Sequence, residues 1–255
     1  MTPTTQPAAI DFNAEFRRAL SLMEETDKNV LVTGRAGTGK STLLSYFRTQ
    51  TKKQAVVLAP TGVAAVNIEG QTIHSFFHFK PSVTPASIKR KKKADKGKPT
   101  VYNRLSTIVI DEVSMVRADL LDCIDKFLRF NGPREKEPFG GVQMIFISDL
   151  YQLPPVVAAA EREIFRNHYE TPYFFSAKVV RELPVEYVEL EKVYRQKDDD
   201  FVRLLNAIRN RSVTDADLAR FNTRCHPAFE PPPDTFYISL TSTNDLADAV
   251  NEKRL

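Results

Sequence analysis

The chain has 255 residues, 42% of them hydrophobic, and its 36 basic and 32 acidic side chains give a net charge of +4. This content can fill one large core or two smaller ones, and no run approaches the ~18 apolar residues that span a bilayer. The first residues contain neither a signal core nor an Arg-rich transit segment, which favours a bacterial cytoplasmic protein. Cys123 and Cys225 show no metal-ligand spacing, so neither a disulfide scaffold nor a zinc site is indicated.

Residues 11–25 predict an amphipathic helix, with Asp11 or Asn13 as its N-cap. In nucleotide-driven motors, a helix placed before the phosphate-binding strand often contacts adenine. Asn13 is therefore a candidate base contact, although a plain packing helix explains the same pattern. The apolar stripe consists of Phe12, Phe16, Ala19, Leu20 and Met23.

Residues 34–41, GRAGTGKS, match the phosphate-loop pattern G-x-x-x-x-G-K-[S/T] at every fixed position. Glycines let backbone N–H groups approach phosphate oxygens, Lys40 supplies a charge to the β- and γ-phosphates, and Ser41 can ligate Mg²⁺. Apolar residues 30–32 before the loop and a helical pattern after it disfavour a chance glycine-rich turn. The predicted nucleotide contacts are Gly37, Thr38, Gly39, Lys40, Ser41 and Thr42.

Residues 55–59 predict a second buried strand, and the stretch 59–77, APTGVAAVNIEGQTIHSFF, follows it. Thr61 and Gly62 form a strand-to-helix turn. Hydroxyl groups, a helix N-terminus and aromatic rings can hold a nucleic-acid single strand by phosphate contacts and base stacking. Phe76 and Phe77 could equally be ordinary core residues.

Residues 80–100 carry three prolines and seven basic residues from Lys89 to Lys98, without hydrophobic periodicity. This composition predicts a mobile insertion or small subdomain at about 80–104. The basic run is either a solvated face or a grip on a phosphate backbone whose strength falls with salt.

Residues 107–115, TIVIDEVSM, predict a buried strand that ends in two adjacent carboxylates. Asp111 can position Mg²⁺, directly or through water, and Glu112 can orient or deprotonate an attacking water. Adjacent carboxylates repel each other unless a cation is near, which favours this interpretation over a helix-capping acid pair.

Residues 141–148 predict another buried strand, which leads into Gln152 and a Pro-Pro pair. Gln152 can reach a γ-phosphate from this strand's carboxyl end. A helix at about 118–130 and the alternation of strands and helices predict an α/β fold, with a mostly parallel sheet covered on both faces. This sheet is expected to be complete near residue 180. Beyond it we predict strands at 185–190 and 236–240, and helices at 200–209, at 214–223 and after LTSTN at 240–244.

Seven motifs occur in a fixed order: GRAGTGKS, APTGVAAVNIEGQTIHSFF, IDEVSM, ISDLYQLPPV, LEKVYRQ, FVRLLNAIR and LTSTN. Together they resemble the petite-integration-frequency (PIF-type) family of superfamily-one DNA helicases, from Phe12 to Leu255. The resemblance implies a RecA-like ATPase domain at 1–180, a partial second RecA-like domain at 181–255, and 5′-to-3′ translocation on single-stranded DNA driven by ATP and Mg²⁺.

The resemblance also assigns roles to residues. Lys40, Glu112, Gln152 and Arg195 are implied as catalytic, with Arg195 presented across the cleft as an arginine finger or, alternatively, an exposed strand-end arginine. Ser41 and Asp111 are the implied metal ligands, and the basic insertion corresponds to a small wedge subdomain. The implied DNA contacts are Thr61, Gly62, Val63, Asn67, His74, Ser75, Phe76, Thr241 and Asn244.

Two departures from the family pattern affect these expectations. Ser148-Asp149 replaces the usual Gly-Asp, and no Gln-Gly motif and no glycine follow Gly141. We therefore expect a fragment with weak ATPase and no unwinding, acting on single-stranded and forked or structured DNA. It is expected to be a monomer, or to pair through the incomplete domain. The alternatives are a single-stranded DNA-binding module whose affinity nucleotide tunes, and an ATPase that acts on RNA or protein.

Overall fold

A computed structural model describes residues 11–90, 100–194, 198–230, 232 and 235–252. The chain divides into two compact units, Met1–Asp199 and Asp200–Leu255. No helix in the described part of the chain is long and apolar enough to cross a membrane.

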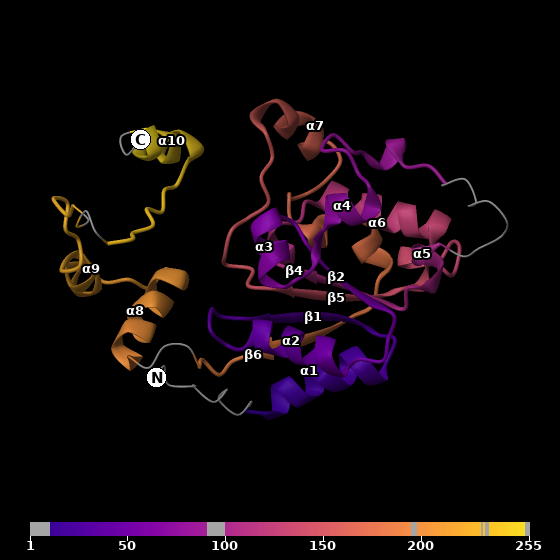
Figure 1. The fold of residues 1–255 in the computed structure, drawn as a ribbon, viewed down its shortest axis with the longest axis horizontal. Coiled ribbons are helices and arrows are strands. Elements are labelled where there is room, and N and C mark those ends of the chain that lie inside the picture. The colour runs from indigo at the N-terminus through magenta and orange to yellow at the C-terminus, as the bar shows by residue number, and fades with distance from the viewer. Residues whose placement is uncertain (1–10, 91–99, 195–197, 231, 233–234, 253–255) are drawn as a thin grey trace. The chain divides into compact units, whose positions relative to one another are not determined.

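The first unit is built on a six-stranded, all-parallel sheet with the order β3-β2-β4-β5-β1-β6 (Figure 1). Because the strands run the same way, their carboxyl ends share one edge of the sheet, where ligands bind in open α/β sheets. The predicted α/β parallel sheet is confirmed. The strands are β1 (Asn29–Gly34), β2 (Ala55–Ala59), β3 (Gln71–Thr72), β4 (Thr107–Asp111), β5 (Gln143–Ser148) and β6 (Val185–Leu190).

Alternate residues of the central strands face two separate cores. In β4, Ile108 and Ile110 enter one apolar cluster, while Val109 enters the other. Such two-sided burial produces nearly continuous apolar strands. Helices α1 (Ala14–Glu25) and α2 (Lys40–Gln50) cover one face, and α6 (Ala118–Asn131) covers the other (Figure 1).

Shorter helices carry the connections at the edges of this sheet, and several begin at side-chain caps. Thr61 accepts a hydrogen bond from Ala64 N–H at the start of α3, and Thr72 accepts one from Ser75 N–H at the start of α4. These helices are α3 (Gly62–Asn67), α4 (Ile73–Phe77), α5 (Val101–Arg104) and α7 (Arg162–Arg166).

Strand β6 corrects the predicted domain boundary. We expected 185–190 to open the second domain, but β6 pairs in parallel with β1 from Asn29↔Val185 to Gly34↔Leu190. Val188 and Leu190 are buried against α1 and α2 in the same core. Periodicity identified the strand, but it could not show which sheet supplies the pairing partner.

The second unit contains α8 (Asp199–Arg209) from its second residue on, α9 (Asp215–Asn222) and α10 (Asn244–Glu252), which agree with the predicted helices. The strand predicted at 236–240 is wrong, because this segment is exposed and has no regular structure. A strand needs a neighbour to satisfy its backbone groups, and none of the described residues pairs with it.

The basic insertion is described only in part. A short 3₁₀ turn, Pro85–Ser87, precedes Ile88, whose side chain is buried in the core beneath α6. Residues 91–99, which hold most of the basic run, lie outside the described residues.

Candidate nucleotide and DNA site

The phosphate loop joins the end of β1 to the start of α2, in the strand-loop-helix order that the motif requires. Gly39 occupies the N-cap of α2 with φ 94°, a backbone conformation that glycine adopts without strain. Thr38 is buried, and its hydroxyl donates to the Arg35 carbonyl at 2.9 Å. The loop therefore holds a fixed shape ahead of a helix N-terminus that favours anions.

Lys40 lies folded over this loop. Its Nζ donates to the carbonyl oxygens of Gly34 at 2.7 Å and Arg35 at 3.0 Å. The Lys40 residue is partly buried. Its charge also lowers the pKa of Asp111 and Glu112 at the carboxyl end of β4, although burial, which raises the pKa, has the larger effect at each carboxyl group.

Asp111 and Glu112 stand at the carboxyl end of β4. Burial raises the pKa of Asp111, and burial together with the Asp111 charge raises the pKa of Glu112. Glu112 also has a left-handed backbone, with φ 50° and ψ 42°, which is uncommon for a residue with a side chain. These like-charged and partly buried carboxyl groups favour a cation or a proton nearby.

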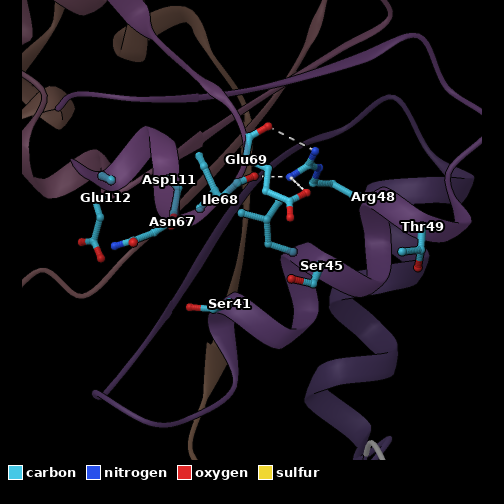
Figure 2. A pocket seen from close by; sticks show the side chains of 11 residues that line it. Ser41, Ser45, Arg48, Thr49, Asn67, Ile68, Glu69, Asp111 and Glu112 are labelled. Atoms are coloured by element: carbon cyan, nitrogen blue, oxygen red, sulfur yellow. Dashed lines mark hydrogen bonds and ion pairs between the residues drawn. The ribbon is translucent and has the colours of Figure 1, made fainter. Parts of the chain in front are cut away.

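A cleft of about 490 Å³ brings the two halves of the site together (Figure 2). Ser41 of α2 lies on one wall, and Asp111 and Glu112 lie on the other. Asn67, which we predicted as a DNA contact, lines the same cleft. The remaining lining residues are Leu44, Ser45, Arg48, Thr49, Ala64, Ile68 and Glu69.

The donor set suits Mg²⁺ held jointly with phosphate oxygens. No group of three or more His, Cys, Asp or Glu side chains that could hold a metal occurs within the described ranges. The Ser41 hydroxyl and the Asp111 carboxylate are hard oxygen donors in one cleft, and Mg²⁺ commonly takes one or two protein ligands and completes its shell with water and substrate phosphates.

Gln152 lies outside this cleft. Its side chain is exposed, and its Nε2 donates to Asp149 Oδ2 at 3.3 Å. Ser148, the departure from the family pattern, is buried, and its hydroxyl accepts a hydrogen bond from Ser114 N–H at 3.1 Å. This bond ties the end of β5 to the turn that follows Glu112.

The predicted DNA contacts in the segment 61–77 differ in their exposure to solvent. Gly62, Val63 and Ser75 are exposed, while Thr61, His74 and Phe76 are partly buried. Phe77 is buried among Phe79, Tyr102 and Phe127, so the core interpretation holds for that ring. Phe76 packs edge-on against Phe77 and Tyr102.

The remaining predicted site residues lie outside the cleft or outside the described part of the chain. Arg195 falls outside the described residues. Thr241 and Asn244 are exposed residues of the second unit, where Asn244 begins α10. Thr42 is exposed in the first turn of α2 and is absent from the cleft lining.

A sequence profile of the family described as PIF1-like helicase matches residues 13–218, which is more than half of the chain. The chain belongs to the PIF1-like helicase family. It is 34% identical over 238 residues to the ATP-dependent DNA helicase PIF1 of Candida albicans, and 33% identical over 241 residues to that of Saccharomyces cerevisiae. These matches cover 89% and 91% of this chain but only 26% and 27% of the relatives.

Solved PIF1-like structures agree with the fold. Pif1 helicase from Bacteroides, in complex with ADP-AlF3 and ssDNA, superposes with a TM-score of 0.87 at 36% identity. The match covers 97% of this chain and 57% of that one. The chain thus spans about a quarter of the curated relatives and a little over half of the solved chain.

In this PIF1-like chain, Tyr194 also contacts the phosphate loop. Its backbone N–H donates to the Gly37 carbonyl at 2.8 Å, and its hydroxyl accepts from Asn13 Nδ2 at 3.3 Å. Asn13 also caps α1, accepting from Phe16 N–H at 2.8 Å. Sequence reasoning passed over Tyr194, although its place directly before Arg195 in the VYRQ motif was a usable signal.

Proposed function

We propose that this chain binds and hydrolyses ATP with Mg²⁺ and uses the cycle to move on single-stranded DNA, as part of a 5′-to-3′ DNA helicase. One observation carries the proposal: Ser41, the last residue of the phosphate loop, and the Asp111–Glu112 pair line one cleft at the carboxyl edge of a parallel sheet. Family membership supports the DNA substrate.

In this proposal the backbone N–H groups of residues 37–40 hold the triphosphate, and Lys40 places its charge on the β- and γ-phosphates. Ser41 and Asp111 hold Mg²⁺, which neutralises charge that develops on the phosphates. Glu112 orients the attacking water and accepts its proton. The raised pKa of Glu112 brings this base nearer to the working pH.

Further roles are proposed from the positions of residues within the family's motifs. Gln152 senses the γ-phosphate, and Arg195 stabilises charge on the transferred phosphoryl group. Exposed residues of the segment 61–77 contact the DNA backbone and bases, together with Thr241 and Asn244 of the second unit. Asn13 and the adjacent Tyr194 lie beside the loop, where an adenine could bind.

The test is steady-state ATPase activity with and without a short oligo-dT strand, for the wild type and Lys40→Ala. Gln50→Ala, an exposed change at the end of the same helix, is the matched control. We expect a rate that DNA raises, that Lys40→Ala abolishes and that Gln50→Ala retains. A strand that binds without raising the rate above the Lys40→Ala background would instead indicate a DNA-binding module.

A further inference from the structure

One face of α2 carries more than the nucleotide contacts. Ser41, Ser45 and Arg48 follow each other at helical spacing, and all three line the cleft that contains Asp111 and Glu112 (Figure 2). The Arg48 guanidinium therefore stands two turns from the candidate Mg²⁺ ligand, on the same rigid helix.

Arg48 binds the backbone at the far end of α3. Its Nη1 donates to the Ile68 carbonyl, and its Nη2 donates to the Glu69 carbonyl at 3.3 Å. Ile68 is the C-cap of α3, and Glu69 follows it with φ 49°. Carbonyl groups at a helix C-terminus lack partners within the helix, and the planar guanidinium satisfies the C-cap carbonyl of Ile68 together with the Glu69 carbonyl beyond it.

The charge pair with Glu69 contributes little beside these carbonyl contacts. Arg48 Nη1 and Glu69 Oε2 are 3.9 Å apart, and the Glu69 side chain is 87% exposed. An exposed pair at that distance is screened by water and salt. The connection from α2 to α3 therefore runs through the backbone of residues 68–69.

The turn at residues 68–70, which Arg48 contacts, is tightly packed. A shift of Arg48 would therefore also move the segments around this turn. A Cβ atom at Gly70 would stand 2.5 Å from the Val57 carbonyl oxygen of β2, and Gly70 N–H donates to the Ala65 carbonyl of α3 at 2.8 Å. Strand β3 begins directly after the turn, and Thr72 at its end caps α4. The turn thus lies between α3 and α4, which contain most of the proposed DNA contacts.

We propose that Arg48 is a positioning residue that couples the nucleotide site to the DNA-contacting segment 61–77. A movement of α2 on nucleotide binding is passed by the guanidinium to the 68–70 turn, and from there to α3 and α4. This inference rests on the proposed function, since it needs both ligands to bind.

The experiment measures the dissociation constant of fluorescent oligo-dT by anisotropy, with Mg²⁺ alone and with Mg²⁺ plus a non-hydrolysable ATP analogue. The ratio of the two constants is the coupling. We expect about 5-fold or more for the wild type, the lower end of typical couplings. Arg48→Lys keeps the charge but loses the two-pronged contact, so its ratio falls to near one, as does that of Arg48→Ala. Glu69→Gln is the matched control and keeps the wild-type ratio.

Thermal unfolding of each variant separates coupling from folding. A purely structural role would change DNA affinity equally with and without nucleotide, and that unchanged ratio in a folded Arg48→Lys protein overturns the inference. A wild-type ratio of one also overturns the inference if both ligands bind and Lys40-dependent ATPase activity is present. In that case the proposed function still stands. Absence of that ATPase removes the proposed function and the coupling with it.

Discussion

The two units of this chain contain helices of similar amphipathic character but bury them to different extents. In the first unit, α1, α2 and α6 place their apolar faces against a six-stranded sheet. In the second unit, Leu204 and Ala207 of α8 are the buried hydrophobic residues within the described ranges. Large apolar side chains there stay exposed, including Leu205, Ile208, Leu218, Phe229, Phe236, Ile238, Leu240 and Leu246.

Strand formation shows the same difference. Residues 55–59 and 236–240 are both short, largely apolar runs. The first forms β2 because β3 and β4 pair with it on either side. The second has no pairing neighbour among the described residues. A helix satisfies its backbone hydrogen bonds within its own segment, whereas a strand needs a partner that can be distant in sequence.

The largest expected effect is on ATP turnover at the candidate nucleotide site of the first unit. Glu112→Gln removes the proposed base but keeps the size of the side chain, so we expect kcat for ATP to fall by roughly 10²–10⁴. Nucleotide affinity should change little. Steady-state kinetics would check the rate, and a Glu112→Gln protein that turns over at the wild-type rate would refute the catalytic role.

The next prediction contrasts the interiors of the two units. Leu58→Ala, in the buried centre of β2, should cost about 2–5 kcal/mol in free energy of unfolding. Leu246→Ala, on the half-exposed face of α10, should stay within about 0.5 kcal/mol. Urea denaturation measures both. Equal losses would show that the second unit has a core of its own.

A smaller effect is expected at Ser148, in the buried end of β5. Ser148→Ala leaves the buried Ser114 N–H without its acceptor, at a cost of roughly 1–3 kcal/mol. Because this bond steadies the turn after Glu112, we also expect kcat to drop several-fold while the KM for ATP holds. Ser21→Ala, on the exposed side of α1, is the control. A stability loss without a kcat change would limit Ser148 to a packing role.

The smallest expected effect is on how the free energy of unfolding changes with pH. Burial lowers the pKa of His74 below its usual value of 6.5. The unfolded chain then binds the proton more readily, so the stability present above the unfolded pKa is lost as the pH falls through the folded pKa. The free energy of unfolding should therefore fall more between pH 7.5 and 5 for the wild type than for His74→Gln. Parallel pH profiles would contradict this assignment.

Much of the first unit followed from its sequence, because the phosphate loop, Asp111–Glu112 and the buried strands are local patterns with a fixed geometric meaning. The position of β6 did not follow, since its pairing with β1 joins segments about 155 residues apart in sequence. The carbonyl contacts of Arg48 and the hydrogen bond of Ser148 were also beyond prediction, because they depend on backbone groups that look alike at every residue.

The central claim is that the phosphate loop and the carboxylate pair form one nucleotide site. Its most direct test is a fluorescence titration of the whole chain with a mant-labelled ATP analogue and Mg²⁺, for the wild type, Glu112→Gln and Lys40→Ala. We predict saturable binding by the first two proteins and its loss in Lys40→Ala. Equal binding by all three would place the nucleotide elsewhere and contradict the claim.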